Sequence, residues 1–202
     1  MVQIPCSSVM AENIQMEIIG AAESRFSHYG YRKTTMAEIA RDVGMSTANI
    51  YRYFANKEEI MAACAERYID DRLQKLRAIV NDTATDATGK ITGYALATLH
   101  FSHDLAMKND KINELIEVIK QRKPELIHKR IQQEIDLIRC ILEEGQQAGE
   151  FDIENLDDTA RTIHSSLIVF DVPLFMDLYP LEEFEKMAGS IARLVTRGIQ
   201  KQ

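Results

Sequence analysis

The sequence predicts an all-α protein, and three observations lead to this fold class. Apolar residues recur three and four positions apart along nearly all of the 202 residues, which is the spacing of an amphipathic helix. No segment shows the sustained alternation and β-branched enrichment that a half-buried strand would show. Glycine and proline stand where the helical patterns stop, as they do at helix ends. A hydrophobic content of 46% is enough to build a core for one or two domains.

The first two helices are expected to end and begin at clear signals. Apolar residues follow a helical pattern over residues 12–29, and Gly30 ends that pattern. Thr35 and Glu38 then form a capping box, in which the hydroxyl and carboxylate side chains bind each other's backbone amides. The second helix is therefore expected over residues 36–43.

A glycine turn separates this second helix from a short third one. Gly44 permits a sharp turn, and Ser46 is suited to cap a helix over residues 47–54. Asn56 is placed to cap a fourth helix over residues 57–80. Two short helices joined in this way form either a structural corner or a DNA-reading unit.

The rest of the chain is expected to be helical as well. The polar stretch 81–88 indicates a loop. Pro124 is suited to the first position of a helix, Gly149 to a helix end, and Pro173 and Pro180 interrupt the pattern before the last helix. The helices of this region are expected over residues 90–107, 111–122, 124–148, 156–171 and 181–199.

The net charge of −7 argues at first against nucleic acid as a partner, because phosphate binding depends on Lys and Arg. The acidic excess, however, lies beyond Asn56. Up to that residue the charges balance: Arg25, Arg32, Lys33, Arg41 and Arg52 against Glu12, Glu17, Glu23, Glu38 and Asp42. Charge therefore neither supports nor excludes DNA binding by the N-terminal part.

The side chains of the third expected helix favour a DNA-reading unit. Ile50 and Phe54 lie four positions apart and must face the core. The positions left partly or fully outward are Thr47, Ala48, Asn49, Tyr51, Arg52 and Tyr53. Thr, Asn and Arg can hydrogen-bond to base edges, while Tyr hydroxyls and a Lys at a helix start can reach phosphate. The alternative for Tyr51 and Tyr53 is packing against the first helix.

Several separate segments of this region together resemble the tetracycline-repressor (TetR) family of transcriptional regulators. They are Lys33-Thr34-Thr35, Ile39-Ala40, Val43-Gly44-Met45-Ser46, Ile50-Tyr51-Arg52-Tyr53-Phe54 and Asn56-Lys57-Glu58. The resemblance implies phosphate contacts by Thr34, Tyr51, Tyr53 and Lys57, and groove contacts by Thr47, Ala48, Asn49 and Arg52. The full set of candidate DNA-binding residues is Thr34, Thr35, Ser46, Thr47, Ala48, Asn49, Tyr51, Arg52, Tyr53 and Lys57.

The resemblance also implies how the chain is divided and what it binds. Residues 1–56 would form a helix-turn-helix DNA-binding domain, and residues 57–202 a helical domain for effector binding and dimerisation. The expected partners are double-stranded DNA with a palindromic operator, a second copy of the chain and a small-molecule effector. The apolar face of the last helix, around Phe184, Ile191 and Val195, is expected to be buried against its two-fold mate.

A cavity for the effector, if present, is expected between helices of the C-terminal part. Its candidate lining residues are Tyr94, His100, Phe101, Ile138 and His164, because apolar walls with a few polar groups suit a small organic molecule.

No cofactor is expected. His100 and His103 share a helix face, so metal binding there stays an open alternative, although their spacing matches no specific metal motif. The cysteines at positions 6, 64 and 140 are odd in number and form no CxxC pair, which favours reduced thiols over a disulfide framework or a zinc module.

The function that these observations favour is that of a dimeric repressor, released from its operator by an effector, rather than an enzyme. A helical enzyme using His100, His103 and His164 is one alternative, and a helical interaction protein without DNA binding is another. No run of about 18 apolar residues and no signal-peptide pattern occurs, so a cytoplasmic location is expected.

Overall fold

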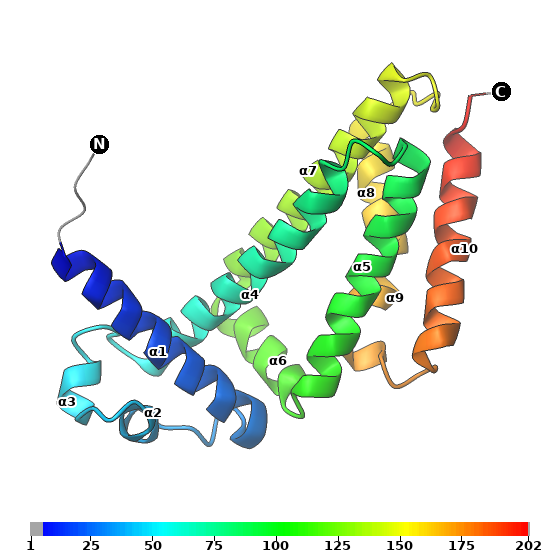
Figure 1. Cartoon of the computed structure of the whole chain (residues 1–202). Helices are drawn as coiled ribbons and strands as arrows, with labels where there is room; N and C mark the ends of the chain where they lie inside the picture. The colour runs from blue at the N-terminus through cyan, green and yellow to red at the C-terminus, as the bar shows by residue number, and fades with distance from the viewer. Residues whose placement is uncertain (1–5, 202) are drawn as a thin grey trace. The chain divides into compact units, whose positions relative to one another are not determined.

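The computed structural model describes residues 6–201, with the side chains of residues 11–201, and it confirms the all-α fold class (Figure 1). Within that part of the chain β-structure is limited to one isolated antiparallel bridge, which pairs Phe151 with Gln200. The helices are α1 (Cys6–Tyr29), α2 (Met36–Asp42), α3 (Thr47–Ile50), α4 (Lys57–Val80), α5 (Ala87–Lys108), α6 (Ile112–Arg122), α7 (Pro124–Gln147), α8 (Leu156–Ser166), α9 (Ile168–Asp171), the 3-10 helix η1 (Pro173–Phe175) and α10 (Leu181–Ile199).

Most helix bounds lie close to those predicted, and three differ. The first helix, α1, begins at Cys6, six residues before its predicted start. The other two differ for local reasons. The third helix keeps α-helical form only over Thr47–Ile50. Beyond it, the amide of Tyr53 donates to the carbonyl of Ile50 at 3.0 Å, three residues back, so the chain continues in tighter turns. The helix expected over residues 156–171 is split at Leu167, whose backbone angles leave the helical range at φ −92° and ψ 0°.

Residue contacts divide the chain into two compact units. The first unit comprises the residues up to Tyr68 together with Asn109–Ile127, and the second comprises Ile69–Lys108 and the chain from His128 onward. This division differs from the expected boundary after residue 56, because α4 contributes its first half to the core of the first unit and α6 adds Val118 to the same core.

The core of the first unit is formed by side chains from five helices and the turn after α3. Its buried members are Ile18, Ile19, Ala22, Phe26, Met36, Ile39, Ala40, Ile50, Phe54, Ile60, Met61, Cys64 and Val118. The predicted capping box at the start of α2 is present: the amide of Glu38 donates to the Thr35 hydroxyl at 3.3 Å, and the amide of Thr35 donates to the Glu38 carboxylate at 2.8 Å. The box fixes where the chain enters α2.

The core of the second unit includes α5, α7, α8, α9 and α10, and α10 packs along α5. Phe170 and Phe184 meet edge to face in it, with ring centroids 6.0 Å apart. Phe184 is 0% exposed within its own unit. The expectation that Phe184 faces a second copy of the chain is therefore wrong, because its ring fills the core of its own subunit.

Among the described residues, no helix is both long enough and apolar enough to cross a membrane.

The turn between α2 and α3 depends on Gly44. Its φ of +67° lies in the left-handed region that favours glycine. The amide of Met45 donates to the carbonyl of Ala40 at 2.8 Å, and that of Gly44 donates to Arg41 at 3.1 Å, which together form a Schellman motif. This motif ends α2 and turns the chain toward α3.

Gly44→Ala is expected to destabilise the fold by about 1–2 kcal/mol through its backbone conformation alone. A Cβ placed on Gly44 meets nothing within 4 Å, so steric overlap does not contribute. The matched control is Gly20→Ala inside α1, where a Cβ also meets nothing within 4 Å. That change should stabilise the protein by roughly 0.5–1 kcal/mol. Urea unfolding at one protein concentration measures the free energy of unfolding of both variants. An equal change for the two substitutions would contradict the left-handed turn at Gly44.

Candidate functional site

The helix-turn-helix of the first unit places one face of α3 in its core. Ile50 is 0% exposed and Phe54 is 7% exposed, as predicted from their spacing. Ser46 caps the helix, because its hydroxyl accepts from the amide of Asn49 at 3.2 Å. With this side of the short helix held inward, the opposite side faces solvent.

Six of the ten candidate DNA-binding residues lie at the surface of this unit. The exposed ones are Thr35, Ser46, Thr47, Ala48, Tyr51 and Arg52. Asn49 is partly buried. The two tyrosines differ, since Tyr51 is 51% exposed whereas Tyr53 packs against the core of the unit. The packing alternative thus holds for Tyr53 and not for Tyr51.

Thr34 is not at the surface. Its side chain is 2% exposed, and its hydroxyl donates to the carbonyl of Gly30 at 2.9 Å. The hydroxyl thus serves the turn between α1 and α2, and its contact with phosphate stays a prediction.

Lys57 also points into the unit. Its ammonium donates to the carbonyls of Tyr31 and Thr34, both at 2.7 Å, and lies 4.2 Å from the centroid of the Tyr31 ring. Burial lowers the pKa of Lys57 from its usual value. In this conformation the ammonium ties the first turn of α4 to the α1–α2 turn, and its contact with phosphate stays a prediction.

Arg25 on α1 neutralises the acidic side chains of α2. Its guanidinium binds both carboxylate oxygens of Asp42, one of them at 2.9 Å, and lies 3.5 Å from Glu38. The hydrogen bond from Arg25 is the main cause that lowers the pKa of Asp42. The exposed cations of the turn, α2 and α3 are Arg32, Lys33, Arg41 and Arg52. The acidic net charge of the chain therefore says little about this face of the first unit.

Sequence reasoning missed the contribution of α6 to this unit. The Glu114 carboxylate accepts from the backbone amide of Arg32 at 3.0 Å. It also lies over Gly30, where a Cβ would come within 2.7 Å of it. The hydroxyl of Ser27 on α1 donates a hydrogen bond to the side-chain oxygen of Asn109, which lies just before α6. No local pattern indicates these contacts, because their partners stand 82 residues apart in the chain.

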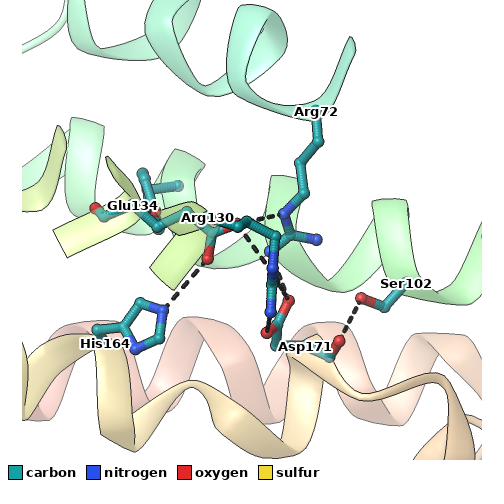
Figure 2. A network of polar contacts seen from close by, with 7 residues as sticks. Arg72, Ser102, Arg130, Glu134, His164 and Asp171 are labelled. Atoms are coloured by element: carbon teal, nitrogen blue, oxygen red, sulfur yellow. Dashed lines mark hydrogen bonds and ion pairs between the residues drawn. The ribbon is translucent and has the colours of Figure 1, made fainter. Parts of the chain in front are cut away.

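A network of charged side chains lies inside the second unit (Figure 2). Arg72 donates to Glu134 at 2.7 Å and to Asp171 at 2.6 Å. Arg130 donates to Glu134 at 3.0 Å and grips Asp171 with two nitrogens, at 3.0 and 2.9 Å. Two guanidinium groups and two carboxylates from α4, α7 and α9 thus meet in one network.

Two further side chains complete this network. The ring of His164 lies 3.2 Å from the second oxygen of Glu134, and the Ser102 hydroxyl donates to the backbone carbonyl of Asp171 at 2.9 Å (Figure 2). Burial alone would raise the pKa of Glu134, but the hydrogen bond with His164 and the charges of Arg72 and Arg130 outweigh it and lower the pKa to about 2. Glu134 is therefore ionised inside the unit.

Four of the five candidate effector-binding residues lie at or near the charged network of the second unit. Tyr94 donates to the backbone of Glu134 at 3.2 Å, His164 contacts the same residue, and Ile138 is 0% exposed. The Phe101 ring lies 5.6 Å from the Arg72 guanidinium. His100 lies apart, with its exposed ring 2.7 Å from Glu185 of α10.

A hollow of about 570 Å³ lies elsewhere in the second unit. Its lining residues are Ala78, Ile79, Asp82, Thr85, Gly89, Lys90 and Gly93. None of the five candidates is among them. Within the described part of the chain, no three His, Cys, Asp or Glu side chains are grouped so that they could hold a metal ion.

An exposed helix held across a glycine turn from a second helix is the arrangement of a helix-turn-helix DNA-binding protein. Residues 18–64 match the family described as "Bacterial regulatory proteins, tetR family". Residues 87–192, more than half of the chain, match "Tetracyclin repressor-like, C-terminal domain". The chain belongs to the TetR family of bacterial regulatory proteins.

Individual relatives agree with this membership. The chain is 29% identical over 145 residues to the fatty acid metabolism regulator protein of Bacillus subtilis (strain 168), which covers 70% of this chain and 72% of the relative. It is 28% identical to a transcriptional regulator from Cytophaga hutchinsonii ATCC 33406, whose crystal structure superposes with a TM-score of 0.72 over 91% of this chain and 97% of the other.

A third likeness shows the fold alone. SmeT, the repressor of the Stenotrophomonas maltophilia multidrug efflux pump SmeDEF, is 21% identical, with a TM-score of 0.68 over 93% of this chain and 91% of SmeT. SmeT is also known as a complex with triclosan. Since the family and the curated relative are transcriptional regulators, the chain is a DNA-binding regulator and not an enzyme.

Lys57→Met is expected to lower the free energy of unfolding by about 1–3 kcal/mol, because two backbone carbonyls lose a hydrogen-bond donor while the apolar stem is kept. Lys33→Met removes an exposed ammonium from the same unit and should stay within about 0.5 kcal/mol of the wild type. Urea unfolding at fixed protein concentration compares them. Equal and small effects would show that Lys57 does not hold the turn in solution.

Proposed function

We propose that this regulator is a homodimeric repressor in which each subunit reads one half-site of a palindromic operator with α3. The observation that carries this proposal is the exposure of Thr47, Ala48, Tyr51 and Arg52 on the side of α3 and its following turn that lies opposite buried Ile50. A helix held in this way can enter the major groove with side chains directed at base edges.

The exposed side chains divide by the chemistry of what they can reach. Arg52, with Asn49 beside it, carries donors suited to base edges, and the Thr47 hydroxyl and Ala48 methyl suit close contact in the groove. The Tyr51 hydroxyl suits phosphate. With Thr34 and Lys57 engaged inside the unit, the phosphate charge would be met instead by Arg32, Lys33 and Arg41. All of these contacts are proposals for the DNA complex.

A homodimer is supported by apolar side chains that the second unit leaves exposed. Those on the segment from α9 through α10 are Ile168, Leu174, Leu178, Tyr179 and Leu194. Leu194 is the most exposed of them at 70%, whereas Ile191 and Val195 are partly buried against the core of their own unit. Exposed apolar side chains of this kind are suited to a two-fold contact, in which the same residues of the two copies face each other.

Release by a small molecule is the remaining part of the proposal. It is supported by SmeT, a protein of the same fold that forms a complex with triclosan. An effector that binds the second unit more tightly in one conformation than in another shifts the population away from the DNA-binding form.

Arg52→Ala is expected to weaken binding to the operator about 5- to 150-fold while binding to scrambled DNA changes little, since a lost base contact costs about 1–3 kcal/mol. Lys33→Ala should instead weaken both duplexes alike and reduce the slope of log affinity against log salt by about 1. The operator is first selected from a random library, and affinities are then measured by fluorescence anisotropy over a range of salt concentrations. Arg161→Ala, an exposed cation of the second unit, is the control. If Arg52→Ala binds as the wild type does, α3 is not the reading helix.

Leu194→Asp is expected to raise the dimer dissociation constant ~100-fold or more, because an unpaired charge at the interface costs at least about 3 kcal/mol. The monomers should keep their helical content and lose operator selectivity. Met107→Asp changes another exposed apolar side chain, 54% exposed on α5, and should leave the dimer intact. Sedimentation velocity measures the assembly. A stable Leu194→Asp dimer would show that this face of α10 is not the interface.

A further inference from the structure

The interior of the second unit holds two positive and two negative side chains in contact. The exposed fractions of the side chains are 1% for Arg72, 2% for Glu134, 10% for Asp171 and 18% for Arg130. Buried charges are stable only when each has its counter-charge and hydrogen bonds. The set therefore tolerates exchange of one carboxylate for another, but neither the loss nor the addition of a charge.

Asp171 and Glu134 are held in different ways. Glu134 lies inside α7, a helix of 24 residues, and contacts His164 as well as both guanidinium groups. Asp171 is the last residue of α9, a helix of four residues, and the chain after it passes through η1 and the stretch to Pro180 before α10 begins. Asp171 is thus the carboxylate that can leave with the smallest change in backbone structure.

The grip on Asp171 has the geometry with which arginine recognises a carboxylate ligand. Two nitrogens of Arg130 meet the two oxygens separately, and a nitrogen of Arg72 shares the first oxygen (Figure 2). Parallel hydrogen bonds of this kind give strength and geometric selectivity for planar anions. We propose that the Arg72–Arg130 pair is a binding site for an organic carboxylate effector, whose carboxylate takes the place of that of Asp171.

This proposal rests on the effector-responsive function proposed above and names the chemical class of the effector. A carboxylate that entered beside Asp171 would leave one uncompensated negative charge in the interior, so entry requires that Asp171 leaves. A neutral or cationic molecule cannot restore the balance. Binding is thereby linked to release of α9, and of the Arg72 contact that ties α4 to it.

The test is chemical rescue of Asp171→Ala by formate and acetate. Removing the side-chain carboxylate leaves a gap beside the arginine pair, and the variant should be less stable than the wild type. Formate or acetate should raise its melting temperature saturably, by about 3–6 °C at ten times Kd. Sodium chloride at the same ionic strength and acetamide should not. The wild type should need a higher carboxylate concentration for the same rise, because there the ligand must first displace Asp171.

Two further variants make the outcome decisive. Asp171→Ala combined with Arg130→Gln removes the paired hydrogen-bond donors of Arg130, so formate should no longer stabilise the protein. Glu154→Ala removes an exposed carboxylate of the same unit, and formate should raise the melting temperature of this control no more than that of the wild type. If Asp171→Ala does not fold, Asp171→Asn keeps the size of the side chain and receives the same titration. If chloride and acetamide raise the melting temperature of the variant as much as formate does, the proposal is wrong. The assay contains no DNA, so its failure leaves the operator proposal untouched, and a protein that binds no operator would still show the rescue.

Discussion

The burial of Ile50 and Phe54 is the contact on which the DNA-facing surface depends. A helix as short as α3, which spans Thr47–Ile50, has no stability of its own, so its orientation comes from what it packs against. Both side chains enter the core of the first unit, at 0% and 7% exposure. Thr47 on α3 and Arg52 in the turn that follows it are then left exposed. The cap at Ser46 and the turn at Gly44 only set where this short helix begins.

The second unit satisfies a different constraint, which is the pairing of charge in its interior. Burying a guanidinium group costs desolvation free energy that neighbouring apolar contacts do not offset. Two such groups are therefore stable in the interior only when carboxylates pair with them. Glu134 and Asp171 do so, and His164 and Ser102 satisfy the remaining acceptors. The result is a polar centre that includes Tyr94 and His164, two of the residues expected to line an effector cavity. In the effector site proposed above, charge rather than shape alone would select the ligand.

The features that the sequence predicts correctly all depend on residues close together in the chain. The capping box of Thr35 and Glu38, the turn at Gly44 and the inward position of Ile50 follow from spacings of a few residues. The charged network does not, because Arg72 pairs with partners 62 and 99 residues away. The hydrogen bonds of Thr34 and Lys57 could not be predicted for a related reason: a family motif names the residues, but not the carbonyls of the α1–α2 turn that engage them in this chain.

The most direct test of the DNA-facing surface is the thiol reactivity of a cysteine placed at Ala48, in a protein whose Cys6 and Cys140 are replaced by serine. Cys64 is buried and raises no competing signal, since burial raises the pKa of its thiol to about 12. Ala148→Cys, at an exposed position of the second unit, is the control. Operator DNA is predicted to slow labelling of Ala48→Cys at least about tenfold and to leave Ala148→Cys unchanged, because the groove encloses α3. Equal labelling of Ala48→Cys with and without bound operator would contradict the account.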